Sequence, residues 1–528
     1  MYFLLVDRFY NADTKNDSVI DRNDPQAFHG GDLQGVEEKL DYLHNIGVDS
    51  IWISPIFTMR TETFHGHGAF HGYWVQHLDS IEKRFGGEDA LKSLSLSMKE
   101  RDMNLILDIV YNHVSFDSPM LEAHPDWFHS YPSIEDWNDP IQLTQYQVHG
   151  LPDLNQSRAP VYQYLLHRSQ YWNQFTENSG FRIDAIRHLD NSFIHKLSQD
   201  LDLWLLGEDF NGNPIELIER AKATDLDALF DFPLYYAMAT SFCDHNNTFA
   251  VASILSMDQY YPKDLQLIRF LDNHDLPRFY SRCQNDASRA NLALSFLFSI
   301  QVLPIISYGT EYWQEGASEP ENRASMQWNK AQESYLPRQI QQLTELRREY
   351  SVLEKGYSEI QFQSEQQLVV AQYRQNSVSY SILNLSEEEF QYSLPQTTIT
   401  KGFLQTESGL KEYKDSTIPG NSLAILVGET QEIPQQETIA IEFTLPINGQ
   451  YILVGNIPEL GGWDPHKAPR FTLSEGTNIL RCTLPKNIVL SYKLVEIVDG
   501  TNYAWETGEN RFLWTNLNNS DTIPLDIK

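Results

Sequence analysis

Short apolar runs alternate with longer segments of helical periodicity over the first two thirds of the chain. Most of these runs show no period-two polarity, which is typical of strands buried on both faces. The segments between them, such as 36–47, 89–102 and 287–300, repeat apolar residues at helical spacing. The apolar runs lie at residues 2–6, 50–54, 104–110, 181–186, 203–207, 226–232, 265–271 and 303–309. Eight strands that alternate with helices predict an α/β fold, a (β/α)8 TIM barrel.

The pattern changes after the third predicted strand and again after a charged helix near 331–350. The gap at 113–157 is rich in Pro, Asp, Trp and His, which favours a small excursion domain over a disordered loop. Beyond the charged helix the periodicity is that of β-strands, interrupted by one polar, proline-containing stretch. We therefore expect a barrel at 1–355 that includes excursion domain B, a β-sandwich domain C at 356–428, a linker at 429–438, and a second β-sandwich at 439–528.

Composition and charge narrow the partners of the protein. The chain has 528 residues, of which 41% are hydrophobic and 21% charged, as in globular proteins. Its net charge of −33 makes nucleic acid and anionic membranes unfavourable partners and carries no penalty for a neutral substrate. Three cysteines are too few and too widely spaced for a disulfide framework or a cysteine-based zinc site.

Targeting signals are missing from the printed sequence. It has no run of about 18 apolar residues that could span a bilayer. Its first residues, MYFLLVDRFYNAD, lack the basic region of a signal peptide. This leaves either a cytoplasmic protein or a secreted one whose leader is absent from the sequence.

Polar residues gather where four of the predicted strands end. The stretches are DIVYNH (108–113), GFRIDAIRH (180–188), LLGED (205–209) and FLDNHD (270–275). Barrel enzymes carry their catalytic groups at the carboxyl ends of the strands. A single aspartate there could be merely solvated, but four clusters in succession indicate an active site at which Asp184, Glu208 and Asp275 converge.

These four stretches resemble the ordered signature regions of the α-amylase family, glycoside hydrolase family 13. LPDLN (151–155) is similar to an additional family region near the end of the excursion domain. Residues 29–56, FHGYW (70–74) and ENRASMQW (321–328) resemble further family stretches, so the likeness runs from residue 1 to about 428.

The resemblance implies a role for each matching residue. Asp184 would be the nucleophile, Glu208 the general acid/base and Asp275 the carboxylate that stabilises the transition state, while Arg182 would orient Asp184 and keep it ionised. Residues that would contact the sugar are His71, Tyr73, His113, His274 and Arg323, with Arg187 and His188 lining the acceptor side. The family commonly has Asp where this chain has Glu319, whose extra methylene would shift that sugar contact.

The chemistry of glycosidic cleavage suits these residue types. One carboxylate must attack the anomeric carbon while an acid protonates the leaving oxygen, and in retaining enzymes the two groups lie roughly 5–5.5 Å apart. We expect a neighbouring negative charge to raise the pKa of Glu208 and Arg182 to favour the ionised form of Asp184. We expect net retention of the α configuration.

The resemblance also implies calcium, an ion that prefers six to eight oxygen ligands. Asn112, Asp153 and the carbonyl of His188 match the structural calcium site of the family, between barrel and excursion domain. A second set resembles the N-terminal calcium loop of cyclodextrin glycosyltransferases, with Asp and Asn exchanged at the first two positions; a solvated turn is the alternative. This set comprises Asn11, Asp13, Asn16, Asp17, Gly30 and Asp32.

The C-terminal unit resembles a family 20 starch-binding module in GQYILVGNIPELGGWDP (449–465), LSYKLVE (490–496) and AWETGENR (504–511). Trp463 and Trp505 match paired indoles that stack on glucose rings, and Lys493 and Asn510 match their polar partners. The alternative is that both tryptophans belong to the core of the sandwich. A second sugar site of such modules lacks its aromatic residues here, with Asn448 in place of one of them.

Domain order favours one member of the family over its relatives. Cyclomaltodextrinases usually carry a module before the barrel, and cyclodextrin glycosyltransferases usually have an immunoglobulin-like domain for which the linker at 429–438 leaves no room. The order predicts a calcium-dependent α-amylase that acts on starch and maltooligosaccharides, extracellular or periplasmic because starch lies outside the cell, and monomeric. The alternatives are an α-glucan transglycosylase and a non-catalytic glucan-binding protein.

Overall fold

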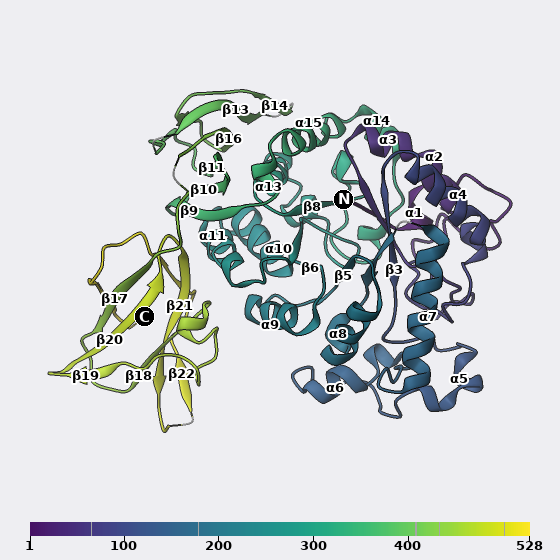
Figure 1. Cartoon of the computed structure of the whole chain (residues 1–528), viewed down its shortest axis with the longest axis horizontal. Helices are drawn as coiled ribbons and strands as arrows, with labels where there is room; N and C mark the ends of the chain where they lie inside the picture. Colours follow the sequence, from purple (N-terminus) through teal and green to yellow (C-terminus); the bar gives the residue numbers. More distant parts are fainter. Residues whose placement is uncertain are drawn as a thin grey trace.

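The computed structural model describes residues 1–64, 66–177, 179–395, 397–406, 409–431, 433–500 and 502–527. Eight parallel strands close into a barrel in chain order, which confirms the predicted TIM barrel (Figure 1). They are β1 (Tyr2–Leu4), β2 (Ser50–Ile53), β3 (Asn104–Ile109), β4 (Ser179–Ile183), β5 (Leu205–Gly207), β6 (Ala228–Phe230), β7 (Gln266–Phe270) and β8 (Leu303–Ser307). Each strand overlaps one predicted run. Most runs extend past the end of the strand, because their last residues leave the ladder and form the rim.

Helices surround the barrel and close its rim. They are α1 (Val6–Phe9), α2 (Leu33–Glu38), α3 (Leu40–Asn45), α4 (Gly87–Lys99), α7 (Ala159–Thr176), α8 (Asn191–Asp200), α9 (Pro214–Thr224), α10 (Phe232–Met238), α11 (Phe249–Leu255), α12 (Phe279–Arg282), α13 (Ala287–Ser299), α14 (Trp328–Glu333) and α15 (Leu336–Glu349). The single helix expected at 36–47 is divided at Lys39, whose backbone leaves helical geometry. The Lys39 ammonium lies over the rings of Tyr10 and Trp328.

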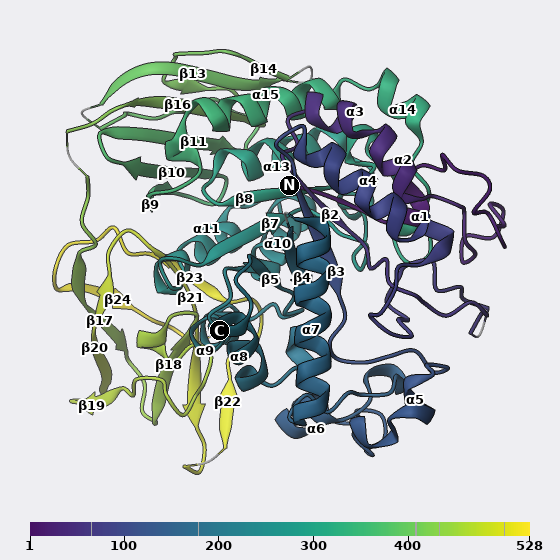
Figure 2. The same ribbon diagram turned by 45° about the vertical axis from the view of Figure 1, so that its right-hand side comes forward.

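Residues 113–157 form a compact excursion after β3. It contains two short helices, α5 (Met120–Ala123) and α6 (Pro140–Gln145), which Figures 1 and 2 show together near one end of α7. Isolated bridges tie His113 to Asp153 and Phe128 to Leu154, so the end of the excursion returns to its beginning. This pairing brings the end of β3 next to the LPDLN stretch.

Two all-β regions follow the barrel, as predicted. The first has a six-stranded antiparallel sheet in the order β14-β13-β16-β11-β10-β9 and a small β12–β15 pair. Its strands are β9 (Tyr357–Gln363), β10 (Gln367–Arg374), β11 (Ser377–Asn384), β12 (Phe390–Gln391), β13 (Thr398–Thr406), β14 (Gly409–Glu412), β15 (Thr417–Ile418) and β16 (Ser422–Glu429).

The C-terminal module has two four-stranded sheets, one in the order β19-β20-β17-β24 and one with β18, β22 and β23 around β21. Its strands are β17 (Thr438–Leu445), β18 (Tyr451–Gly455), β19 (Thr472–Ser474), β20 (Thr477–Pro485), β21 (Val489–Ile497), β22 (Tyr503–Trp505), β23 (Arg511–Trp514) and β24 (Asp521–Pro524).

The module packs directly on the barrel. Figures 1 and 2 both show it beside α9 and α11. Asn456 donates to the carbonyl of Ser253, and the backbone of Val489 donates to the hydroxyl of Ser256. The rings of Phe249 and Phe512 stack across the same interface. Buried apolar residues of both parts belong to one contiguous core, so the module is fastened to the barrel by more than its linker.

One disulfide joins Cys243 to Cys283, and Cys482 is free. The sequence analysis did not predict this bridge. The two cysteines lie 40 residues apart and meet only because the end of the π-helix Ala239–Asp244 packs against the end of α12.

Candidate active site

The three predicted carboxylates lie at the carboxyl rim of the barrel. Asp184 follows β4, and its backbone N–H donates to the carbonyl of Ile109 in β3. Glu208 follows β5 and donates in the same way to Ile183 in β4. Asp275 lies on the loop after β7, where its N–H is held by the side chain of Asn273. Backbone hydrogen bonds between neighbouring strands thus fix where the first two side chains begin.

A single arginine gathers two of these carboxylates. Nη1 of Arg182 lies 2.7 Å from Oδ1 of Asp184, and Nη2 lies 3.1 Å from Oε2 of Glu208. Because the guanidinium is a rigid planar fork, the two carboxylates lie side by side. The side chains of Asp184 and Glu208 are 11% and 8% exposed, whereas that of Asp275 is 30% exposed, so the group opens to solvent on the Asp275 side.

Burial and charge separate the proton affinities of these carboxyls. Burial, with the added negative charges of Asp184 and Asp275, raises the pKa of Glu208 well above its ordinary value despite the attraction of Arg182. For Asp275, burial acts in the same direction, but His274, Arg323 and Arg182 outweigh it and lower its pKa. One carboxyl is therefore held protonated beside another that is held ionised, the arrangement that acid/base catalysis requires.

Asp108 is a member of this group to which sequence reasoning assigned no role. Its carboxylate lies 2.8 Å from Nη1 of Arg182 and accepts hydrogen bonds from Trp52 and Tyr73. Burial raises the pKa of Asp108 to about 7. The available signal was its position: it opens the DIVYNH stretch on the strand next to Asp184.

Aromatic rings form one wall of the site. The rings of Tyr73 and His274 stack with centroids 5.1 Å apart, and those of His71 and Tyr73 are stacked with centroids 5.8 Å apart. Burial lowers the pKa of His274 to about 3, and it also lowers those of His71 and His113, so these rings are neutral at pH 7. His113 Nε2 lies 3.2 Å from the carbonyl oxygen of Tyr73. Neutral imidazoles offer one donor and one acceptor each, which suits sugar hydroxyls.

Arg323 connects the rim to the Glu319 loop. Its Nη2 lies 3.0 Å from Oδ1 of Asp275, and its Nη1 lies 2.8 Å from Oε1 of Glu319. Glu319 therefore contacts the arginine that holds Asp275, and the longer side chain in place of the family's Asp keeps that ion pair.

Arg187 and His188 lie on the turn after β4. Arg187 reaches the carbonyl of Phe210 on the loop that follows Glu208. His188 Nδ1 lies 2.9 Å from the carbonyl oxygen of Leu143, and its ring contacts Trp137, so it joins the excursion to the rim. Burial lowers the pKa of His188 to about 4.

The predicted calcium ligands are brought together around buried oxygen atoms. The side-chain oxygens of Asn11, Asn16 and Asn112 are buried and have no hydrogen-bond partner. Asn112 lies beside the buried Asp153, because His113 pairs with Asp153 and the N–H of Leu154 donates to the Asn112 carbonyl. Within the described ranges, no group of three or more His, Cys, Asp or Glu is placed to hold a metal. The two predicted sets combine carboxylates with amide and backbone oxygens, the ligand types that calcium prefers, and calcium binding stays a prediction.

The N-terminal set is closely packed. Asn11 donates to both carboxylate oxygens of Asp17, and Oδ2 of Asp32 accepts from the backbone of Asp13. A Cβ on Gly30 would lie 2.4 Å from Asn11 and 2.5 Å from Asp17, so only glycine fits there. These contacts hold parts of NADTKND against Gly30 and Asp32, and the choice between a calcium loop and a solvated turn stays a prediction.

The predicted sugar-binding residues of the module lie on or beside the sheet built around β21. Trp505 is 42% exposed, whereas Trp463 is half-buried against a small core that includes Val454 and Val495. Lys493 donates to the carbonyls of Glu506 and Gly508 and so holds the turn after Trp505. Asn510 donates to Ser491. The alternative, in which both tryptophans belong to the core of the sandwich, therefore holds in part for Trp463 and does not hold for Trp505.

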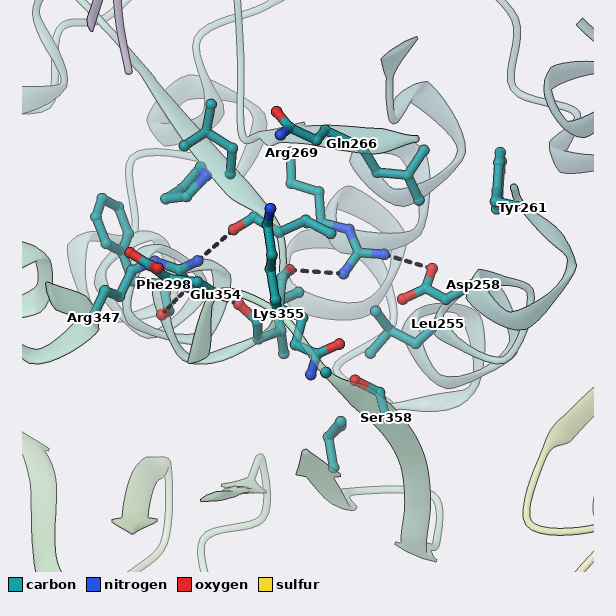
Figure 3. Close-up of a pocket in the computed structure, with 18 of the residues that line it drawn as sticks. Leu255, Asp258, Tyr261, Gln266, Arg269, Phe298, Arg347, Glu354, Lys355 and Ser358 are labelled. Atoms are coloured by element: carbon teal, nitrogen blue, oxygen red, sulfur yellow. Dashed lines mark hydrogen bonds and ion pairs between the residues drawn. The ribbon is translucent and has the colours of Figure 1, made fainter. Parts of the chain in front are cut away.

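A large cavity lies away from the carboxylates. It measures about 910 Å³ and is lined by residues at the start of β7 and β8, by α15 and by both β-rich regions (Figure 3). Its buried Arg269 is bonded to Asp231 and Asp258, and Arg347 donates to the backbone carbonyls of Phe298 and Ile300. The cavity occupies the amino end of the barrel, opposite the catalytic rim.

Two family models match the chain. The model of the α-amylase catalytic domain covers residues 3–342, and the model of the starch-binding domain covers residues 438–523. Within the described ranges, no helix has both the length and the hydropathy needed to cross a bilayer.

Individual relatives include both hydrolases and transferases. The chain is 26% identical to a cyclomaltodextrin glucanotransferase of Klebsiella oxytoca, over 99% of this chain and 92% of the relative. It is 30% identical to α-amylase 2 of Schwanniomyces occidentalis, over 62% of this chain and 66% of the relative.

Solved structures show the same division. An Anoxybacillus α-amylase has a TM-score of 0.74 at 31% identity, covering 82% of this chain and 98% of its own. The γ-cyclodextrin glucanotransferase of Bacillus clarkii shares the fold, with a TM-score of 0.73 at 19% identity over 100% of this chain and 98% of its own.

Proposed function

Since the chain belongs to the α-amylase family of glycoside hydrolases and carries a starch-binding domain, we propose that it is a retaining α-amylase that hydrolyses the α-1,4 bonds of starch and maltooligosaccharides. The observation that supports this most is the pairing of Glu208, with its raised pKa, and Asp184 on one guanidinium. A carboxyl that holds its proton beside a second carboxyl that can attack the sugar is what a double displacement needs.

In the first step, a carboxylate oxygen of Asp184 attacks the anomeric carbon as the bond to the leaving oxygen breaks. Glu208 gives its proton to that oxygen, so the departing sugar leaves as a neutral alcohol and Asp184 carries a glycosyl ester. Arg182 contacts both groups and orients Asp184 for the attack. Asp108 shares the same nitrogen of Arg182 and so acts as its positioning partner.

In the second step, Glu208 is ionised and accepts a proton from water, whose oxygen attacks the same carbon from the opposite face. Asp184 is released, and two inversions give net retention. Asp275, held ionised by Arg323, faces the positive charge that develops on the sugar. Tyr73 supplies a stacking face, and the neutral rings of His71, His113 and His274 supply hydrogen bonds to hydroxyls.

Transfer to a sugar is the second candidate. A specific observation favours it: one relative that matches nearly the whole chain is a cyclomaltodextrin glucanotransferase. Arg187 and His188 would contact the acceptor in either reaction. The domain order described above favours water. With soluble starch, hydrolysis predicts reducing ends that rise in step with the loss of iodine colour, whereas cyclic or elongated products without new reducing ends would establish transfer.

The C-terminal module would hold starch through the exposed Trp505 and through Trp463, with Lys493 and Asn510 shaping the turn and strand beside them. An indole face covers the apolar C–H face of glucose, and polar groups bind its rim.

Calcium would cross-link the loops around the site without entering the chemistry. Asn112, Asp153 and the His188 carbonyl would hold one ion, and Asn11, Asp13, Asn16, Asp17, Gly30 and Asp32 a second. The unpartnered amide oxygens of Asn11, Asn16 and Asn112 support this assignment. A ligand that binds only the folded state raises the unfolding temperature. EDTA should therefore lower that temperature and calcium, but not magnesium, restore it; no response to either would contradict both sites.

Secretion and a monomeric state complete the proposal. The Cys243–Cys283 bridge supports an extracellular or periplasmic location, since disulfides persist in oxidising compartments. The net charge of −33 gives no attraction to anionic partners, in agreement with a neutral polysaccharide substrate.

The anomeric form of the first product tests the mechanism. Proton NMR during the first minutes of maltopentaose hydrolysis should show the α-anomer before it mutarotates. A first product in the β form would overturn the retaining mechanism.

A further inference from the structure

We infer that the acceptor side of the active site continues across the barrel surface onto the C-terminal module, as one binding surface for a long α-glucan chain, with Tyr236 as a stacking platform between the two. This inference rests on the proposed function. It concerns residues that lie outside the carboxylate group and that the mechanism does not use.

The loop after β5 would contact the glucan chain next to Glu208. Two residues beyond Glu208, Phe210 is 37% exposed although its ring packs on Phe232 at 4.5 Å. Gly212 follows, and a Cβ there would lie 3.0 Å from the ring of Tyr236 on α10. Tyr236 itself is 43% exposed. Two large aromatic side chains beside the catalytic loop therefore present part of their surface to solvent, where a sugar ring could stack.

The same loop ends at the module. Asn213 caps α9, and Ile215 is the second residue of that helix. A Cβ on Gly462 would lie 2.9 Å from the side chain of Ile215, so the module backbone touches α9 there. The next residue is Trp463, one of the two tryptophans of the proposed starch site. Seven residues of the barrel, 209–215, thus separate Glu208 from contact with the module's sugar-binding loop.

The spacing between the two parts is fixed by the interface. Near this contact, Tyr260 donates to Glu459 in the turn before Gly462, and Asn456 is 2% exposed against the barrel. A glucan bound at both ends would therefore meet a preformed surface, without the entropic cost of ordering a flexible linker. Aromatic faces exposed along the way suit the repeated apolar faces of a linear α-glucan.

The inference predicts that chain length decides the effect of Tyr236. We expect Tyr236→Ala to lower kcat/KM on linear amylose by about 3- to 10-fold, the value of one stacking contact, and to change that on 4-nitrophenyl maltotrioside less than about 2-fold. Tyr236→Phe should keep the wild-type ratio of the two. Trp463→Ala should shift the ratio in the same direction as Tyr236→Ala.

Tyr171→Ala is the matched control, because Tyr171 is 42% exposed on α7, outside this surface. Its ratio should equal that of the wild type, and unfolding temperatures should show that each variant is folded. Equal losses of Tyr236→Ala on both substrates, or no loss on either, would overturn the inference. Failure of the proposed function is a different result: the wild type would then cleave neither substrate.

Discussion

Two buried arginines, Arg182 at the catalytic rim and Arg269 beside the large cavity, each gather carboxylates, and they do so with different results. Arg269 contacts two, Asp231 and Asp258, and gives its remaining nitrogen to the backbone carbonyl of Gln301. Arg182 contacts three, Asp108, Asp184 and Glu208. Burial, together with the negative charges of Asp184 and Asp275, outweighs the attraction of Arg182 and raises the pKa of Glu208, so Glu208 holds its proton.

The comparison shows that cavity size is a poor guide to chemistry in this molecule. The large cavity lies at the Arg269 end, where that arginine is fully bonded and Asp258 is the carboxyl with a raised pKa, to about 6. The Arg182 end has the surplus carboxylate, the neutral histidines and the partly exposed Asp275. A difference in charge balance, rather than in volume, separates the catalytic end from the structural one.

Replacing one carboxylic acid beside each arginine should give the largest difference in activity between the two groups. Glu208→Gln keeps the shape but cannot donate the proton, so we expect kcat on maltooligosaccharides to fall by about 10²- to 10⁴-fold. The matched variant Asp258→Asn should retain kcat within about 3-fold, because Asp258 touches Arg269 and not substrate. Steady-state measurements of kcat for both variants check this. A comparable loss of kcat in the two variants would contradict a catalytic role that is specific to the Arg182 group.

The pH dependence of kcat/KM should report the proton that Glu208 holds beside Arg182. Glu208 acts as an acid only while protonated, and its pKa is raised. The value of kcat/KM should therefore hold through neutral pH and then fall about tenfold per pH unit above the pKa of Glu208. The alkaline limb should be the same in Asp258→Asn. A shift of the alkaline limb of kcat/KM in Asp258→Asn would contradict this, because the essential proton would then depend on Asp258 rather than on Glu208.

A smaller effect is expected on the surface of the module. Trp505→Ala should weaken binding to starch granules by up to about tenfold, since one exposed indole is lost. Hydrolysis of maltotetraose should stay unchanged, because Trp505 lies on the module, apart from both arginine groups. Sedimentation of the protein with starch granules measures this. Undiminished binding of Trp505→Ala would show that Trp505 does not contribute to starch binding.

The smallest effect concerns the stability of the Arg269 end. Asp258 holds its proton up to about pH 6 in the folded state, whereas an unfolded chain releases it near pH 3.9. The folded state therefore binds more protons in this window, and the free energy of unfolding falls as pH rises through it. Asp258→Asn should remove that part of the slope. Urea unfolding at about pH 4 and about pH 6 compares the two proteins, and parallel slopes would contradict the assignment.

The sequence predicted those features that depend on local pattern. All eight barrel strands were found because strands buried on both faces are short apolar runs, and the carboxylates were found because they end such runs. The role of Asp108 was missed, since its value lies in sharing a nitrogen of Arg182 with a residue 76 positions further along.

Features made by distant contacts could not be predicted. Three such features join segments that are distant in the sequence and share no pattern in it. They are the contact of Gly462 with Ile215, the Cys243–Cys283 bridge and the cavity beside Arg269. Each follows from packing of complete elements, which a one-dimensional pattern does not encode.

The central claim is that Asp184 forms a bond to sugar while Glu208 handles the proton. Peptide mass spectrometry of Glu208→Gln, incubated with α-maltotriosyl fluoride, tests it directly, because fluoride leaves without an acid and the second step lacks its base. The account predicts a maltotriosyl ester on Asp184. A sugar attached to Asp275 or to any other carboxylate would contradict it.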